Sequence, residues 1–183
     1  MSVSMSEEQA RAHFVAFVTD HTAALMRTAV LVTRSPQRAE DLVQDTLAAL
    51  LPKWRKVALA DSDLAYVRRA LLNRYLSNSR RRSGSVDVSD SRRDAAEARL
   101  APDIATQIAD RDHVHRLLSG LPARQRAAIV LRFYHDLNDA ETAKTLGCRV
   151  GTARSLISRA LATMRTAPVT AVPLTDSHKE MPA

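Results

Sequence analysis

The strongest constraint on the fold is a long polar break in the middle of the chain. Residues 80–103 read RRRSGSVDVSDSRRDAAEARLAPD, a charged run without periodic hydrophobicity. Such a composition is typical of a linker. The break divides the 183 residues into two segments, each the size of a small domain. We therefore predict domains at residues 7–80 and 104–166, a flexible linker at 81–103 and a disordered tail at 167–183.

Both sides of the break carry the apolar spacing of helices. Large apolar residues recur at steps of three and four, which is the period of an amphipathic helix. The chain has only 4 glycines and 4% aromatic residues, which argues against an all-β fold. The predicted fold class is therefore all-α, with two small helical domains joined by a flexible linker and four helices in the C-terminal domain.

The N-terminal domain contains start signals for three helices. Each signal is a side chain that can accept a hydrogen bond from the first turn, in two cases followed by a capping-box partner or a helix-starting proline. We expect Trp54 and Tyr75 to be core aromatic residues. The three start signals are Ser6 with Gln9, Ser35 with Pro36, and Asp61 or Ser62.

The C-terminal domain contains the pattern of a helix-turn-helix. Asn138 and Glu141 can cap a short helix, and Gly147 follows its last apolar residue, where a left-handed conformation favours glycine. A second amphipathic helix then begins at Val150. In this motif the second helix lies in the major groove of DNA. Its expected packing side consists of Val150, Ala153, Leu156, Ile157, Ala160, Leu161 and Met164.

The opposite side of this second helix has the chemistry of a DNA contact. Arginine can donate two hydrogen bonds to guanine or contact phosphate, hydroxyl groups can bond bases or phosphates, and glycine permits close approach of the backbone. The pattern alone leaves a second interpretation open, a basic surface helix of a four-helix domain. The residues on this side are Gly151, Thr152, Arg154, Ser155, Ser158 and Arg159.

The positive charge is concentrated in two places. The chain carries a net charge of +7, and residues 66–93 hold eight basic against two acidic side chains. A smaller excess lies in residues 138–183, with six basic against four acidic. Two separated basic regions indicate two contacts with a polyanion. For the run Arg80–Arg82 alone, a solvated linker is an equally good interpretation.

The sequence argues against several functional classes. The single cysteine, Cys148, excludes an internal disulfide and a Cys-rich zinc site. His113 and His115 are two residues apart, so on a helix they face different directions. No phosphate-binding loop or nucleophile elbow is present, and the polar start is unlike a secretion signal. We expect no enzyme, no cofactor, no metal and no membrane span, and a cytoplasmic location.

Three segments together resemble a known family. SPQRAEDLVQDTLAAL, AYVRRALLNRYLS and LPARQRAAIVLRFYHDLNDAETAKTLGCRVGTARSLISRALATMR stand in the order and spacing typical of extracytoplasmic-function (ECF) sigma factors. These are promoter-recognition subunits of bacterial RNA polymerase. The resemblance covers residues 11–166 and is strongest to the SigE-like actinobacterial group. It implies binding to core RNA polymerase and promoter DNA, a separate anti-sigma factor, and a monomer when free.

The resemblance also implies roles for three sets of residues. The set that matches the core-polymerase contact is Asp41, Leu42, Gln44 and Asp45. The set that matches the minus-ten element contact is Tyr66, Arg68, Arg69, Asn73 and Arg74. The set on or just before the last helix, for the minus-thirty-five element, is Arg149, Thr152, Arg154, Ser155, Ser158 and Arg159.

Two departures from the family and one alternative remain. Arg149 stands where most relatives have a serine-like cap, and losing such a cap costs about 1 kcal/mol of helix stability. Residues 77–79 replace an acid and an aromatic residue that many relatives carry. The alternative function is a stand-alone helix-turn-helix regulator with an N-terminal sensor or dimerisation domain. The EDLVQDTL helix, followed by an arginine-rich helix, argues against that alternative.

Overall fold

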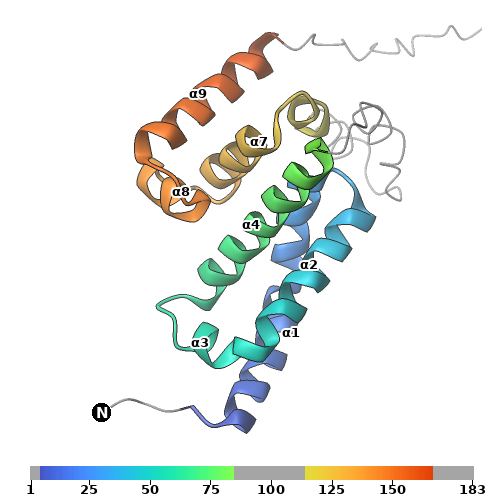
Figure 1. The fold of residues 1–183 in the computed structure, drawn as a ribbon, viewed down its shortest axis with the longest axis vertical. Coiled ribbons are helices and arrows are strands. Elements are labelled where there is room, and N and C mark those ends of the chain that lie inside the picture. The colour runs from blue at the N-terminus through green and yellow to red at the C-terminus, as the bar shows by residue number, and fades with distance from the viewer. Residues whose placement is uncertain (1–4, 85–113, 167–183) are drawn as a thin grey trace, which may run out of the picture.

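The computed structural model describes residues 5–84 and 114–166, and every regular element in these ranges is helical (Figure 1). The predicted all-α class is confirmed. The expected linker and tail fall almost wholly outside the described residues. One difference concerns the third long helix, which continues to Gly84 and so enters the range expected as linker.

The N-terminal domain is built from three long helices and two short ones. The long helices α1, α2 and α4 pack side by side, while α3 lies at the end of the bundle away from the C-terminal domain (Figure 1). Their bounds are α1 Glu7–Thr33, α2 Pro36–Leu50, the 3-10 helix η1 Leu51–Lys53, α3 Trp54–Ala58 and α4 Asp63–Gly84.

The predicted start signals of these helices are confirmed. Ser6 caps α1 in a reciprocal capping box with Gln9. Ser35 caps α2 ahead of the proline at its first position. The alternatives for α4 are resolved in favour of Ser62, whose hydroxyl accepts a hydrogen bond from the backbone N–H of Ala65. Local capping chemistry therefore sets where these helices begin.

An apolar core holds the N-terminal helices together. The Trp54 ring lies edge-on to Phe14 and Phe17, with ring centroids 4.8 and 4.9 Å apart. Tyr75 is buried on α4, so both predicted core aromatics are confirmed. Burying side chains of this size is the main stabilising term for so small a bundle.

Helix α1 has the length and composition of a membrane span. It is 27 residues long and includes an 18-residue window with a mean hydropathy of 1.3. A core helix of a folded domain has the same properties. In this structure α1 packs against α2, α3 and α4, and it contributes Phe17, Leu25 and Val32 to the core.

The C-terminal domain contains the expected helix-turn-helix. Asn138 and Glu141 form the predicted capping box of α8, and Gly147 ends that helix with φ 61°. Helix α9 follows directly, as expected. The elements are a helical segment at 114–119, α7 Ala123–Ile129, the π-helix η2 Val130–Tyr134, α8 Asp139–Leu146 and α9 Val150–Thr166.

One prediction about the packing side of α9 is wrong. Val150, the first residue of the helix, is 37% exposed. The buried residues of α9 are Ala153, Ile157 and Ala160.

The end of α7 widens into a π-helical turn that the apolar pattern does not predict. The backbone N–H of His135 bonds to the carbonyl of Val130, five residues earlier. Such turns are frequent at functional positions. This turn leaves Phe133 62% exposed and places Tyr134 and His135 beside α1.

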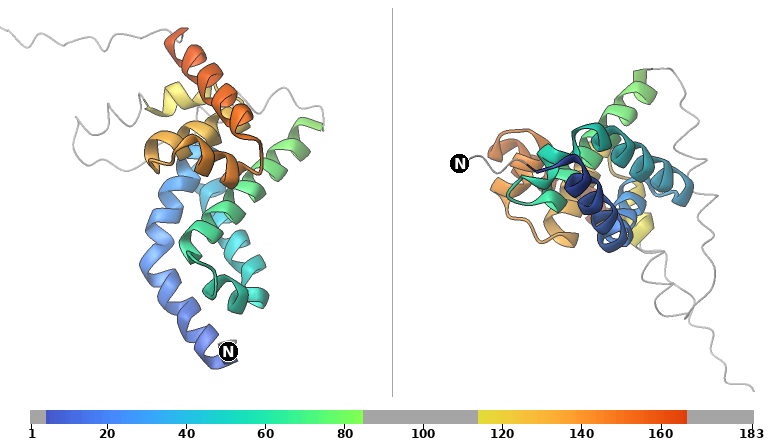
Figure 2. Two further views of the ribbon diagram at one scale, coloured as in Figure 1. Left: turned by 90° about the vertical axis from the view of Figure 1, so that its left-hand side faces the viewer. Right: turned by 90° about the horizontal axis from the view of Figure 1, so that it is seen from below.

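The two domains pack against each other, which sequence reasoning did not predict (Figure 2). Helices α7 and η2 contact α1, and α7 and α8 contact α4. Arg126, only 8% exposed, joins the two parts. It donates hydrogen bonds to the carbonyls of Leu118 and Leu121 in its own domain and to the carbonyl of Val32 on α1.

Candidate nucleic-acid and partner interfaces

Helix α2 presents an acidic face to solvent. Asp41, Gln44 and Asp45 are exposed, so they are accessible to a partner. Leu42 is 3% exposed and belongs to the core, and it therefore sets the position of α2 rather than offering a surface of its own. Two carboxylates one helical turn apart suit basic side chains on a partner.

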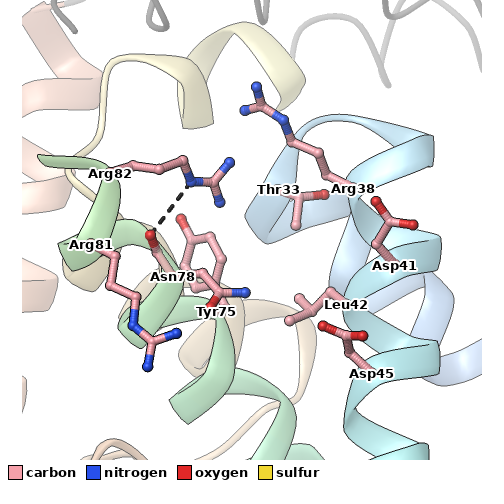
Figure 3. A pocket seen from close by; sticks show the side chains of 9 residues that line it. All are labelled: Thr33, Arg38, Asp41, Leu42, Asp45, Tyr75, Asn78, Arg81 and Arg82. Carbon is pink, nitrogen blue, oxygen red and sulfur yellow. Dashed lines mark hydrogen bonds between the residues drawn. The ribbon is translucent and has the colours of Figure 1, made fainter. Parts of the chain in front are cut away.

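A pocket of about 390 Å³ separates this acidic face from the end of α4 (Figure 3). Asp41 and Asp45 enter it from α2, while Arg81 and Arg82 enter from α4. The α2 wall thus carries two carboxylates and the guanidinium of Arg38, whereas the α4 wall carries two guanidinium groups. The remaining lining residues are Thr33, Leu42, Tyr75 and Asn78.

One ion pair links two of the predicted sets. Arg74 Nε and Nη2 lie 3.2 and 3.1 Å from Asp45 Oδ2. Arg74, which is predicted to contact minus-ten DNA, is therefore paired with Asp45, which is predicted to contact the polymerase. Both remain substantially exposed, so the pair adds little to stability.

The first half of α4 faces the C-terminal domain. Tyr66, Arg68 and Arg69 line a pocket of about 330 Å³ together with Glu141 and Lys144 of α8. Burial lowers the pKa of Arg68 from its ordinary value, and the nearby Tyr134 opposes that shift. Three of the five predicted minus-ten residues therefore border the other domain. Asn73 is exposed elsewhere on α4.

His135 lies in this same contact between the domains. Its Nε2 is 3.0 Å from the Thr28 hydroxyl oxygen, and that hydroxyl donates its hydrogen to the carbonyl of Ala24. The Thr28 oxygen can therefore accept from Nε2 of a neutral ring. Burial, assisted by the positive charge of Arg68, lowers the His135 pKa to about 4.

Helix α9 carries the predicted minus-thirty-five set on its solvent side. All six side chains are exposed, and they lie either on this helix or at the residue just before it. The side-chain hydroxyl of Ser155 donates to the carbonyl of Gly151 within the helix. A polar, basic helix face that follows a tight turn fits the major groove.

Two residues important to these surfaces were missed by sequence reasoning. Asp139, the first residue of α8, accepts a hydrogen bond from Arg154 Nε at 2.8 Å. Its position beside Asn138 predicts only a role in the first turn of the helix. Arg126 is buried between the domains, although it is a charged residue. The Asp139–Arg154 contact and the contacts of Arg126 with Val32 and Tyr75 join residues at least 15 positions apart, so no local signal marks them.

In the described ranges 5–84 and 114–166, no three histidine, cysteine, aspartate or glutamate side chains gather in a metal-binding arrangement. What the described surfaces offer is charge and hydrogen-bonding groups in exposed, extended arrays. Such arrays suit macromolecular partners.

Comparison with known proteins identifies the family to which these surfaces belong. The profile described as "Sigma-70, region 4" matches residues 111–164, which include the helix-turn-helix. The chain is 33% identical to the RNA polymerase sigma-E factor of Streptomyces avermitilis over 155 residues, which cover 83% of each protein. It is 31% identical to the ECF RNA polymerase sigma factor SigL of Mycobacterium tuberculosis over 82% of this chain and 85% of that protein.

A solved structure supports the same assignment. The sigma factor RpoE of Bartonella quintana, crystallised with the anti-sigma factor NepR, superposes with a TM-score of 0.66 and 28% identity. The match covers 84% of this chain and 94% of RpoE, so it extends over both domains. This chain therefore belongs to the ECF family of sigma-70 RNA polymerase sigma factors.

Proposed function

We propose that this sigma factor divides promoter recognition between its two domains, which we assign to residues 7–80 and 104–166. The N-terminal domain would bind core RNA polymerase and the minus-ten element, and α9 would contact the minus-thirty-five element. The observation that carries the proposal is the exposure of all six predicted side chains on and next to α9. None of the six is needed for the core, so all are available to DNA.

The acidic face of α2 is the proposed polymerase contact. Asp41 and Asp45 are exposed one helical turn apart, and Gln44 lies beside them. Basic side chains of the polymerase would pair with the two carboxylates. Leu42 would contribute indirectly, because its burial in the core fixes the orientation of α2.

The arginine-rich face of α4 is the proposed minus-ten contact. Arg69 and Asn73 are exposed, whereas Tyr66 and Arg68 are partly covered where α8 approaches. Single-stranded DNA is held by phosphate contacts and by base stacking on aromatic rings. Full access to Tyr66 and Arg68 therefore requires the domains to separate, and we expect the free protein to bind promoter DNA weakly.

Regulation by a separate anti-sigma factor is part of the proposal. The RpoE structure that matches both domains contains such a partner. A protein that binds across both domains of this chain would keep α8 against α4. We also propose a cytoplasmic location, where core polymerase and promoter DNA are found.

The relatives do not support the stand-alone regulator. The sigma-E and SigL matches extend over four fifths of this chain, so they include the N-terminal domain as well as the helix-turn-helix. A regulator that shared only the DNA-binding motif would match over the C-terminal third alone.

Transcription in vitro tests the proposal. Purified core enzyme is incubated with fragmented genomic DNA of the source organism, with and without the full-length protein, and RNA 5′ ends are sequenced. We expect discrete new start sites that share two upstream elements. Asp41→Asn with Asp45→Asn should abolish these starts and lower binding to core, while the exposed Glu8→Gln leaves both unchanged. Starts with no shared element would contradict the two-domain division.

A further inference from the structure

Arg154 is the only member of the minus-thirty-five set for which the described structure records an ion pair. Its Nε lies 2.8 Å from Asp139 Oδ2, so an arginine in the second turn of α9 is tied to the first residue of α8. The side chains are 69% and 33% exposed, respectively. The arginine therefore projects into solvent from a partly buried carboxylate.

The geometry of this contact leaves the far end of the guanidinium available. Arginine carries five N–H donors in one plane. Only Nε is bonded to Asp139, and the described structure records no hydrogen bond from either Nη atom. A bidentate contact with guanine uses two parallel N–H groups. Fixing Nε sets the orientation of the plane and leaves Nη1 and Nη2 for the base.

The other ion pair of a predicted DNA contact has a different geometry. Arg74 uses both Nε and Nη2 on Asp45, which occupies one whole edge of its guanidinium. Arg149 and Arg159 are exposed, and no acidic partner is recorded for either among the described residues. No carboxylate fixes the guanidinium groups of these two arginines, so each can turn towards a phosphate. The guanidinium of Arg154 is held in one orientation by Asp139.

Stability alone does not account for an acid at this place. An exposed ion pair contributes little to folding, and a carboxylate beside a DNA-binding helix repels phosphate. Asp139 also lines a groove of about 260 Å³ with Arg154, Ser158 and Arg165 along α9. Asp139 thus lies at the edge of the surface that would face DNA. Its negative charge would lower the affinity for DNA, so a contribution to sequence specificity is needed to explain its presence.

We propose that Asp139 is a positioning residue that orients Arg154 for a single guanine in the minus-thirty-five element. This inference rests on the proposed role of α9 in that element. It adds a specificity determinant outside the recognition helix itself. Arg154 supplies the contact, and Asp139 limits the directions in which that contact can form.

The test uses full-length protein with core polymerase and a pool of promoter DNA randomised in the upstream element. Wild type should select guanine at one position. Arg154→Ala should lose about 10-fold of that preference. Asp139→Ala should reduce the preference for guanine about 3-fold, with no effect at other positions. The guanidinium would be less ordered but could still contact the base. Asp139→Asn, which keeps an acceptor oxygen, should fall between Asp139→Ala and wild type.

Two controls separate positioning from other roles. Glu141→Gln removes a charge from the same turn of α8 without a recorded contact to Arg154, and it should leave the guanine preference unchanged. In the Arg154→Ala background, Asp139→Ala should cause no further loss of preference. Additive losses would show that Asp139 acts independently, and the inference would be wrong.

The outcomes also distinguish this inference from the proposed function. If wild type selects no upstream sequence, the assignment of α9 to the minus-thirty-five element fails. If wild type selects guanine and Asp139→Ala retains the full preference, only the positioning role fails. A uniform gain in affinity for all sequences, with selection intact, would reduce Asp139 to a repulsive charge and would equally overturn the inference.

Discussion

Arg126 Nη1 on α7 donates a hydrogen bond to the hydroxyl oxygen of Tyr75 on α4, 3.1 Å away and 51 residues distant in the chain. The same guanidinium bonds carbonyls of both domains. Burial raises the pKa of Tyr75, and the positive charge of Arg126 opposes this shift. One buried side chain thus joins the C-terminal domain to two helices of the N-terminal domain.

Replacing Arg126 should weaken the whole molecule. Arg126→Met removes the donors for three buried carbonyl groups, and we expect the free energy of unfolding to fall by about 3 kcal/mol. Urea denaturation followed by circular dichroism measures this change. Arg124→Met, at an exposed position two residues earlier, is the matched control and should change stability by less than about 0.5 kcal/mol. Equal effects of the two substitutions would contradict the assigned role.

The contact at His135 should make stability depend on pH. The pKa is about 4 in the folded protein and 6.5 in the unfolded chain, so folding favours the neutral ring. The stabilisation is complete above pH 6.5 and is lost as the pH falls from 6.5 towards 4. Thermal unfolding at several pH values should show wild type losing more stability than His135→Gln over this range. Parallel curves for the two proteins would exclude His135 as the cause.

The Arg74–Asp45 pair should matter for function more than for folding. Because both side chains are substantially exposed, Arg74→Ala and Asp45→Ala should each lower stability by less than about 1 kcal/mol. Asp45→Ala should weaken binding to core polymerase, and Arg74→Ala should weaken opening of the minus-ten element by the assembled holoenzyme. Fluorescence anisotropy with labelled core and permanganate footprinting measure the two effects. A large loss of stability in either variant would mean that the pair is structural.

The start of α9 should gain stability from a conventional cap. The carbonyl of Arg149 accepts from the N–H groups of Thr152 and Ala153, but the arginine side chain has only donors and cannot accept from the first turn. Arg149→Ser should stabilise the free protein by about 1 kcal/mol. If Arg149 contacts phosphate, the substitution should also weaken binding to the upstream element equally for all sequences. The slope of log affinity against log salt concentration should then become less steep by about 1. Unchanged salt dependence would remove Arg149 from the DNA contact.

Local signals in the sequence predict much of this fold. Ser6, Ser35 and Asn138 are N-caps as expected, and Gly147 adopts the left-handed conformation. Each of these features depends on hydrogen bonds within a few residues of the chain. The all-α class follows from the apolar periodicity for the same reason.

Contacts between distant segments could not be predicted in this way. Arg126 is buried because Val32 and Tyr75 supply acceptors, and neither is marked as its partner in the sequence. The π-helical turn at Val130–Tyr134, which contacts α1, has no marker in the apolar pattern. Of the predicted site residues, Leu42 is buried, and Arg68 lines a pocket shared with α8.

The single cysteine allows a direct test of where the C-terminal domain sits on a promoter. Cys148 lies in the turn between α8 and α9, next to Gly147 and Arg149, and its thiol is free. An iron chelate attached to this thiol cleaves DNA within its reach. In the complex of labelled protein, core polymerase and promoter, we predict strand cuts confined to the minus-thirty-five region. Cuts centred on the minus-ten element or the start site, in a complex that still transcribes, would contradict the division of promoter recognition between the two domains.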